Sequence, residues 1–330
     1  MTTIALFNNK GGVGKTTLVY HLAHMISRLG VRVLAADLDP QANLTAHFLD
    51  EDALEELWGE HRPTRQTVAD AVQPIVDGEG DVMPVSPREI AEGLWLLPGD
   101  LGLSQFEERL AQEWPATLAG GNKAAARTTT ALHRLVHAAA GTVEAEVVLL
   151  DAGPSLGALS RTTLLVAEQV IVPLGADLFS AQGLRNLGPA LRRWRRDWQE
   201  TAQPRLPAGI DAPSGAMQPL GYVVMQPSMR LDRPVRAYQR WVDRIPDLYV
   251  RAVLGADPGP VSDDRSHEIS TIRNYRSLMP LAHDARKPMF DLRPADGAIG
   301  STQRYVQICF AEFRALAQEI LRRLHIDPAA

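Results

Sequence analysis

The chain has 330 residues, of which 45% are hydrophobic and 22% charged, so it has enough apolar sequence for a large buried core. Its formal net charge of −5 excludes a protein that is basic overall, so any contact with nucleic acid must come from a local patch. The single cysteine, Cys309, excludes an intrachain disulfide and a metal site built from cysteines alone.

The start of the chain lacks the basic segment and the apolar core of a signal peptide. No apolar run approaches the roughly 20 residues that a helix needs to span a bilayer. We therefore expect a cytoplasmic protein with no membrane partner.

A strand, a glycine-rich loop, a helix and a second strand are predicted at the start of the chain. Residues 4–7 are a short apolar run, and apolar residues recur at helical spacing from Leu18 to Leu29, where Gly30 ends the pattern. Residues 31–36 indicate a buried strand that ends at Asp37-Leu38-Asp39-Pro40. Such a βαβ unit predicts a parallel sheet covered by helices.

Strands and helices continue to alternate along the rest of the chain. Acidic residues, prolines and glycines weaken the pattern at about residues 50–88, where we expect an insertion with loops. The other predicted elements are a strand and turn at 94–99, a helix at 103–118, a flexible loop at 120–130, a helix at 131–140, strands at 147–151, 169–174 and 220–225, and an amphipathic helix at about 305–324. The alternation predicts one doubly wound α/β domain over residues 1–330, with a mostly parallel sheet flanked by helices.

The loop before the first helix has the composition of a phosphate-binding loop. Its sequence is Lys10-Gly11-Gly12-Val13-Gly14-Lys15-Thr16-Thr17. Glycines let backbone N–H groups approach an anion, and the following helix N-terminus adds its dipole. Lys15 is expected to reach the β- and γ-phosphates, and the Thr16 hydroxyl to ligate Mg2+. An ordinary tight turn is the alternative, but the Lys-Thr-Thr ending and the flanking strand and helix favour a P-loop NTPase.

Two features distinguish this loop from the usual pattern. Asn9 stands where a glycine is expected, and Lys10 is a second lysine at the start of the loop. The loop is therefore a variant of the common phosphate-binding loop.

Three carboxylates lie at the predicted ends of strands. Asp37, Asp39 and Asp151 all follow buried apolar runs. Ligands bind at this edge of an open parallel sheet, so a carboxylate here can hold Mg2+ through water or orient an attacking water. An isolated aspartate more commonly caps a helix or a turn. Because a phosphate loop lies at the same edge, we expect Asp39 and Asp151 to be functional and Asp37 to have a supporting structural role.

Several stretches in this order resemble the ParA/MinD family of ATPases. The loop from Lys10 to Thr17 is similar to the family's deviant Walker A motif. Residues 37–45 resemble the second motif of the ParA/Soj branch, and residues 148–157 resemble its Walker B and switch segment. The match continues at 172–174 and 181–184. Residues 273–276, with Pro280 and Lys287-Pro288, resemble the segment near the base pocket. Together they cover roughly half of the chain.

The resemblance implies a switch driven by ATP and Mg2+. Two ATP-bound subunits would pack face to face as a homodimer, and Lys10 of one would reach the phosphates bound by the other and offset the charge that develops during hydrolysis. Asp39 matches the carboxylate that positions the attacking water, and Asp151 matches the Walker B acid near Mg2+. Asn274 falls in the segment near the base. Slow ATP hydrolysis, stimulated by a ParB-like or other partner protein, is implied.

The sequence departs from the family pattern at two positions. Gly153 stands where the family often has proline, and Ile272 stands where a proline is common before the base segment. We therefore expect the geometry of the switch segment and of the base contacts to differ.

The resemblance also implies a role in partitioning plasmids, chromosomes or other cargo by ATP-dependent, non-specific binding to DNA, which would associate the protein with the nucleoid. The candidate DNA contacts are Arg185, Arg192, Arg193, Arg195 and Arg196, in one predicted helix and its approach. A second basic group comprises Arg230, Arg233, Arg236 and Arg240. The alternative for the first group is a solvated helix face with Trp194 and Trp198 in the core.

Three other function classes use related sequences. A MinD-like membrane-positioned ATPase would need a basic amphipathic tail, whereas the predicted last helix is more easily read as a packing helix. A metal-cluster carrier of the same fold would need interface cysteines, and Cys309 stands alone in an apolar helix. A metabolic enzyme on this fold, such as a ligase, would need a pocket for a second substrate, which the sequence does not locate.

Overall fold

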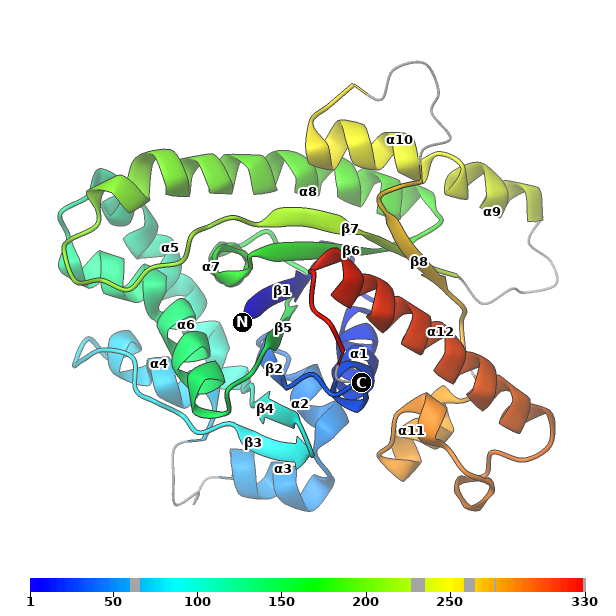
Figure 1. Ribbon diagram of the computed structural model, residues 1–330. Helices are drawn as coiled ribbons and strands as arrows, with labels where there is room; N and C mark the ends of the chain where they lie inside the picture. Colours follow the sequence, from blue (N-terminus) through cyan, green and yellow to red (C-terminus); the bar gives the residue numbers. More distant parts are fainter. Residues whose placement is uncertain (60–65, 227–234, 258–264, 276, 329–330) are drawn as a thin grey trace.

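The computed structural model of the chain describes residues 1–59, 66–226, 235–257, 265–275 and 277–328 (Figure 1). At their centre lies an eight-stranded sheet with the strand order β3-β4-β2-β5-β1-β6-β7-β8. Neighbouring strands run parallel except for the antiparallel pair β3 and β4 at one edge. The strands are β1 (Thr2–Leu6), β2 (Val33–Leu38), β3 (Arg88–Ala91), β4 (Leu94–Leu97), β5 (Val147–Ala152), β6 (Gln169–Gly175), β7 (Gln218–Met225) and β8 (Glu268–Ile272).

Helices cover both faces of this sheet. The α-helices are α1 (Lys15–Arg28), α2 (Asn43–Phe48), α3 (Glu51–Trp58), α4 (Val68–Val76), α5 (Ser104–Ala119), α6 (Lys123–Thr142), α7 (Ala158–Val166), α8 (Leu178–Arg196), α9 (Val235–Val242), α10 (Ile245–Tyr249), α11 (Met279–Ala285) and α12 (Ser301–Arg323). The short helical turns are η1 (Leu101–Leu103), η2 (Asp197–Ala202), η3 (Gln203–Arg205), η4 (Val250–Leu254), η5 (Met289–Asp291) and η6 (Pro294–Asp296). The predicted doubly wound α/β fold is thus confirmed.

Successive residues of each central strand point to opposite faces and fill two cores. In β5, Val148 and Leu150 pack into the core that α4, α5, α6, α7 and α8 cover. Val147 and Leu149 pack into the core that α1 and α12 cover. In Figure 1 these two groups of helices lie on opposite sides of the strands. All six residues of β2 and β5 are buried, as expected for central parallel strands.

The carboxyl ends of the central strands meet at one edge of the sheet. Asp151 of β5 pairs in register with Leu6 at the end of β1 and with Asp37 near the end of β2. The loop that follows β1 and both of these carboxylates therefore start from the same level of the sheet. This edge positions the functional site.

The segment expected to be an insertion adds elements at one end of the sheet. It supplies α3, α4 and the antiparallel edge strand β3, while residues 60–65 lie outside the described part of the chain. The prediction of a flexible loop at 120–130 is wrong, because α6 begins at Lys123. The Asn122 side chain accepts a hydrogen bond from the Ala125 N–H at 3.0 Å and caps this helix, and the alanines that follow are strong helix formers.

The last helix packs against the body of the protein, as the sequence predicts. Phe313, Leu316 and Ile320 of α12 are buried against α1. Cys309 is buried in the same face, and burial raises the pKa of its thiol, so it is a core residue. Among the helices described, none combines the length and the hydrophobicity needed to cross a bilayer.

Replacing either of two helical glycines by alanine should have opposite effects on the stability of the protein. A Cβ on Gly188 of α8 would lie 1.8 Å from the backbone oxygen of Ala252, whereas a Cβ on Gly141 of α6 would meet nothing within 4 Å. Gly188→Ala should therefore lower the free energy of unfolding by about 3 kcal/mol or more, because the backbone must move. Gly141→Ala should raise it by about 0.5 kcal/mol, because alanine is the better helix former. Chemical denaturation of both variants measures this, and equal effects would contradict the packing of α8 on η4.

Candidate functional site

The phosphate loop is fixed to the sheet by a buried asparagine. The Asn8 amide nitrogen donates to the carbonyl oxygen of Pro173 in β6 at 2.6 Å, and its side-chain oxygen accepts the Lys10 N–H at 2.9 Å. One side chain thus holds the start of the loop against the neighbouring strand. Nothing in the sequence pairs Asn8 with a residue 165 positions away, so its role could not be predicted from the sequence.

Glycines shape the loop where it turns into α1. Gly12 and Gly14 have φ of 73° and 89°, which L side chains rarely adopt, and Gly14 forms the N-cap of α1. A Cβ on Gly11 or Gly12 would meet nothing within 4 Å, so open space lies over the loop. A cleft of about 350 Å³ occupies this space, and it is lined by Gly11, Gly12, Gly14, Lys15, Thr16, Thr17, Asp39, Gln41, Asn43, His47 and Pro154.

Lys15 is the buried cation of this cleft. It is the first residue of α1 and its exposure is only 7%. Burial lowers the pKa of its ammonium, while Asp151 and Asp39 act to raise it. A phosphate bound over the loop would supply further negative charge at this point, which suits the predicted role of Lys15.

The two fully buried aspartates at this edge have different surroundings. One oxygen of Asp37 accepts hydrogen bonds from the N–H and the hydroxyl of Thr45 at 2.8 and 2.7 Å, and the other accepts the Asp39 N–H at 3.3 Å. Burial raises the pKa of Asp37 to about 6 against the lowering effect of these bonds. Asp37 therefore ties β2 to α2, in agreement with a supporting structural role.

Asp151 lacks such support. Neither carboxylate oxygen makes a hydrogen bond within the described residues, although both are buried. Burial, with the nearby charges of Asp37 and Asp39, raises the pKa of Asp151 well above its ordinary value, and Thr16 and Lys15 offset this only in part. An orphaned buried carboxylate beside a threonine hydroxyl fits a hard cation such as Mg2+ bound together with phosphate oxygens. Thr16 and Asp151 are the residues that would hold it.

Asp39 lies where the switch segment meets the cleft. It is buried, and its Oδ1 accepts the Gln41 N–H at 3.0 Å. A Cβ on Gly153 would lie 3.2 Å from the same oxygen, so any larger residue at position 153 would press on Asp39. Glycine at position 153, where the family pattern has proline, therefore leaves room for Asp39 beside the switch backbone.

A second cavity lies beside the loop and the first turn of α1, next to the ends of β7 and β8. It has a volume of about 440 Å³, and its wall includes Asn274, whose side chain is exposed. The base segment is held by Glu312 of α12, which accepts the Arg273 N–H at 3.2 Å, pairs with the Arg273 guanidinium at 2.9 Å and accepts the Tyr275 hydroxyl. Met225, Ile272, Met279, Met289 and Phe313 supply apolar walls. The cavity suits a nucleotide base.

The two lysines of the loop point to different places. Whereas Lys15 faces the carboxylates, the Lys10 ammonium pairs with Asp177 at 2.7 Å and lies 5.8 Å from the centre of the Phe179 ring. Burial acts to raise the pKa of Asp177, but the hydrogen bonds from Lys10 and the Ser180 N–H lower it below its ordinary value. Asp177 is also the N-cap of α8. An aspartate directly before a helical run is an N-cap signal, so this role of Asp177 could have been predicted from the sequence.

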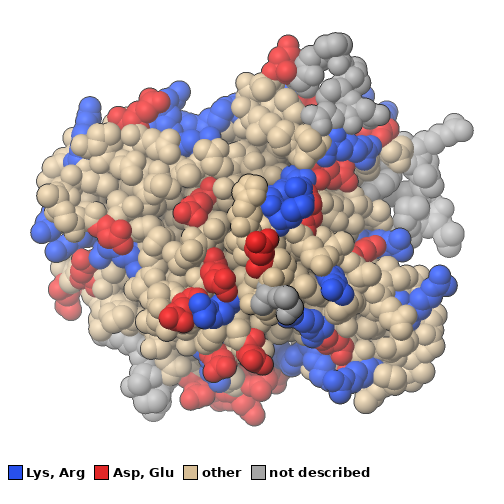
Figure 2. Space-filling model, viewed as in Figure 1, with Lys and Arg blue, Asp and Glu red and all other residues tan. Residues whose placement is uncertain are grey.

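The five candidate DNA arginines of α8 divide into two groups. The Arg192 guanidinium donates to the carbonyls of Ala252 and Val253, and that of Arg195 donates to the carbonyl of Met217. These two arginines brace the fold. Arg185, Arg193 and Arg196 are exposed. Basic side chains gather along the edge of the molecule formed by α8 in Figure 2.

The second basic group is described only in part. Arg230 and Arg233 lie outside the described residues, and the side chain of Arg236 is not described. Arg240 is exposed at 5.8 Å from the centre of the Trp241 ring. Trp194 of α8 and Trp198 of the following turn are both buried, as expected if this helical segment packs through its apolar face.

The N-terminal part of the chain is similar to known proteins. Residues 1–203 match the AAA_31 family, which is described as an AAA domain. The chromosome partitioning protein ParA of Caulobacter vibrioides is 30% identical over 195 residues, which are 59% of this chain and 64% of that protein. The chromosome-partitioning ATPase Soj of Thermus thermophilus is 34% identical over 195 residues, which are 58% and 62%. The matched region thus spans less than two thirds of these relatives.

A solved structure extends the likeness in fold to nearly the whole chain. The crystal structure of a Corynebacterium diphtheriae protein has a TM-score of 0.68 at 24% identity, and the match covers 98% of this chain and 99% of that one. This likeness concerns the fold alone.

The unequal support of the two buried aspartates predicts opposite effects of neutralising them. At neutral pH and without nucleotide, Asp151→Asn should raise the free energy of unfolding by about 1–3 kcal/mol, because it removes a buried acid whose ionisation is opposed by burial, Asp37 and Asp39 more than Thr16 and Lys15 favour it. Asp37→Asn should lower it by about 1 kcal/mol, because an amide N–H would face the Asp39 N–H. Asp151→Asn should also lose the Mg2+-dependent part of the stabilisation by ATP. Thermal and chemical denaturation with and without Mg-ATP measure both.

The effect of Asp151→Asn should depend on pH. A raised pKa means that the folded chain holds the proton more tightly than the unfolded chain does. The stability cost of this buried carboxyl is therefore absent below the ordinary pKa of 3.8, grows as the pH rises above that value and is complete once the pH passes the raised pKa. The difference in stability between variant and wild type should shrink as the pH is lowered from 7. A difference that grows on acidification would contradict this account of Asp151.

Proposed function

This chain belongs to the ParA/MinD family of P-loop ATPases, and we propose that it is an ATP- and Mg2+-dependent dimerisation switch that binds DNA without sequence preference and partitions chromosomal or plasmid DNA. Its ATPase activity is slow and stimulated by a ParB-like or other partner protein. Dimers ride on the nucleoid, and hydrolysis releases them.

The observation that carries the proposal is the divergence of the two loop lysines. Lys15 is buried among the carboxylates of its own cleft, while Lys10 extends away from them to Asp177, with about a third of its side chain exposed. A loop that needed both cations for its own phosphates would aim both into the cleft. The position of Lys10 supports a role toward a second subunit.

The residues of the cleft divide the chemistry between them. Lys15 and the loop N–H groups bind the β- and γ-phosphates, and Asp39 orients the water that attacks the γ-phosphate. Mg2+, held by Thr16 with Asp151 nearby, neutralises phosphate charge when it is bound. Lys10 of the partner subunit then offsets the charge that builds up as the bond between the γ-phosphate and the leaving ADP breaks. Hydrolysis thereby depends on dimerisation.

The surface around Lys10 supports a subunit interface at this face. Leu178 and Phe179 directly follow Asp177 and are 57% and 72% exposed, and Leu156 of the switch segment is 37% exposed. Apolar side chains exposed beside a charged cleft are typical of a surface that a partner covers. The Lys10–Asp177 pair holds Lys10 in its own subunit until this face is closed.

Arg185, Arg193 and Arg196 supply the DNA contacts. Each arginine that neutralises a phosphate adds roughly one unit to the slope of log Kd against log salt, so the six arginines of a dimer give a slope of about 5. Dimerisation doubles the number of contacts, which makes binding depend on ATP.

The proposal predicts nucleotide-dependent DNA binding. Fluorescence anisotropy with a non-specific duplex should show tight binding with ATP and Mg2+ and little binding with ADP, with ATP alone or without nucleotide, at two salt concentrations. Lys10→Ala should lose the ATP-dependent binding. Failure of every nucleotide state to bind DNA, with ATP-dependent dimerisation intact, would exclude the DNA role, and liposome pelleting would then test for a membrane partner.

A matched pair of variants tests the assignment of the arginines. Arg193→Ala with Arg196→Ala should reduce the salt slope by roughly 4 units per dimer. The control changes Arg304 and Arg314, which are two exposed arginines of α12, and should leave the slope unchanged. Equal effects of the two pairs would show that general charge, and not α8, binds the DNA.

Release of Lys10 from Asp177 should favour the dimer. Asp177→Asn keeps an N-cap side chain for α8 but removes the charge that holds Lys10. Each exposed pair is worth about 0.5 kcal/mol, so loss of the two pairs in a dimer should tighten ATP-dependent dimerisation about fivefold. Sedimentation equilibrium with Mg2+ and a slowly hydrolysed ATP analogue measures this. A dimer that is unchanged or weaker would contradict the holding role of Asp177.

A further inference from the structure

A glutamate from outside the nucleotide site caps the helix that follows the switch segment, residues 153–157. The carboxylate of Glu107 in α5 accepts the Ala158 N–H at 2.6 Å with one oxygen and the Leu159 N–H at 2.7 Å with the other. These are the first two residues of α7, whose own N-cap residue, Gly157, offers no side-chain cap. The helix dipole strengthens both bonds, because a negative charge is favoured at a helix N-terminus.

A close approach and a ring contact add to this cap. A Cβ on Gly157 would lie 2.3 Å from Glu107 Oε1, so the glutamate lies directly against the switch backbone. Two turns further along α5, the Trp114 ring lies 4.1 Å from the Arg161 guanidinium of α7. Glu107 and Trp114 are seven residues apart and thus share one face of α5. Together they hold the first turn of α7 at two points.

The switch segment is therefore anchored at both ends. At its start, Gly153 lies against Asp39, the candidate water-positioning carboxylate. At its end, Glu107 holds Ala158 and Leu159. A displacement of the segment on nucleotide binding must either break the bonds to Glu107 or move α5 with it.

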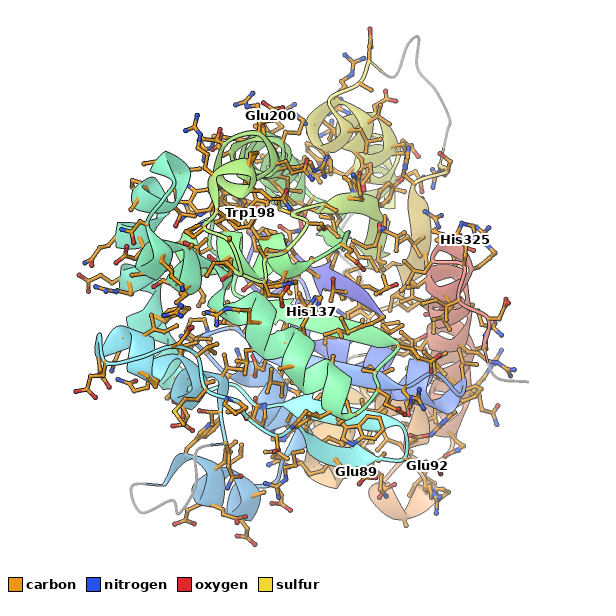
Figure 3. All side chains as sticks on the ribbon, turned by 60° about the vertical axis from the view of Figure 1, so that its left-hand side comes forward. Glu89, Glu92, His137, Trp198, Glu200 and His325 are labelled. Carbon is orange, nitrogen blue, oxygen red and sulfur yellow. The ribbon has the colours of Figure 1, made fainter. Side chains whose placement is uncertain are left out.

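The same face of α5 contacts the end of the arginine-bearing helix α8. Trp114 stacks on Trp198, with 6.3 Å between ring centres and 15° between planes. Trp198 is fully buried in η2, which continues directly from α8 beyond Arg193 and Arg196. In Figure 3, Trp198 lies on the inner side of this turn and Glu200 on its outer side. Burial lowers the pKa of Arg161 to about 10, and the charges that act on it are those of Glu107, Arg193 and Asp197.

We propose that Glu107 is a positioning residue for the switch segment, and that α5 carries the nucleotide state of this segment to the arginine-bearing end of α8. This regulation rests on the proposed DNA-binding function. Glu107 touches neither nucleotide nor DNA. It acts by fixing where the backbone between Asp151 and α7 stands relative to Asp39, and Trp114 extends the same contact to Trp198.

Three variants separate this role from a merely structural one. Glu107→Ala removes both bonds to α7, and Glu107→Gln keeps one acceptor but places an amide N–H against the other backbone N–H. Glu108→Ala changes the adjacent, exposed glutamate and serves as the control. The measurements are the Kd for Mg-ATP, kcat, and the ratio of the DNA affinity with ATP to that with ADP.

We expect the Glu107 variants to bind Mg-ATP normally but to lose the effect of nucleotide on hydrolysis and on DNA affinity. Glu107→Ala should leave the Kd for Mg-ATP within about twofold, lower kcat about tenfold and reduce the ratio of DNA affinities at least about fivefold. Glu107→Gln should fall between this variant and wild type, and Glu108→Ala should match wild type. An unchanged affinity ratio in a Glu107→Ala variant that binds Mg-ATP normally would overturn the proposal.

Hydrogen exchange tests the role of Glu107 and α5 separately from DNA binding. If wild type does not bind DNA, the proposed DNA-binding function is wrong, but the exchange measurement still tests whether α5 carries the nucleotide state. In wild type, Mg-ATP should change the exchange of residues 104–119 and 197–202, which lie outside the nucleotide site. The change should be lost in Glu107→Ala and retained in Glu108→Ala. A change of equal size in Glu107→Ala, or none in wild type, would show that α5 does not carry the nucleotide state.

Discussion

The buried charges at the carboxyl edge of the sheet are the constraint on which the rest of the structure depends. Lys15, Asp37 and Asp151 are buried within one small region, and neither oxygen of Asp151 has a hydrogen bond of ordinary geometry among the described residues. Burial of charged groups that their neighbours compensate only in part is destabilising by several kcal/mol, so this arrangement persists only because the surrounding cores impose it. An anion over the loop and a hard cation beside Asp151 would satisfy these groups. The site is thus incomplete without its ligands, which is the property a nucleotide switch requires.

Much of this could be predicted from the sequence, because the information is local. The glycine loop with its Lys-Thr-Thr ending, and the aspartates that follow apolar strands, fix the position of Lys15, Asp39 and Asp151 at one sheet edge without knowledge of tertiary contacts. The wrong prediction of a flexible loop at 120–130 also has a local cause. Glycines and threonines in this stretch favour a loop, although Asn122 caps a helix and the alanines after it are helix formers.

The partners of the site could not be predicted, because they come from distant parts of the chain. Asn8 meets Pro173, Lys10 meets Asp177, and Glu107 meets Ala158 across 165, 167 and 51 positions. Such contacts depend on how elements pack and leave no periodic pattern. They also share a purpose in the proposed mechanism. Asp177 restrains the loop on the side that faces a second subunit, and Glu107 restrains the switch segment on the side that faces α8. In this mechanism, nucleotide bound at one edge of the sheet therefore affects both dimerisation and DNA binding.

The central claim is that Lys10 acts on nucleotide bound by the partner subunit, and mixing two inactive variants tests it most directly. Lys10→Ala retains Asp39, and Asp39→Ala retains Lys10, so a mixed dimer has one site with both groups if Lys10 acts across the interface. We predict that each variant alone hydrolyses ATP poorly and that the mixture recovers activity, because a mixed dimer keeps one Lys10 across the interface, which a Lys10→Ala homodimer lacks. Random pairing with one complete site in each mixed dimer gives a recovery of about a quarter of the wild-type rate per subunit. A mixture that stays as inactive as its components, while mixed dimers form, would mean that Lys10 serves only its own subunit and would contradict the account.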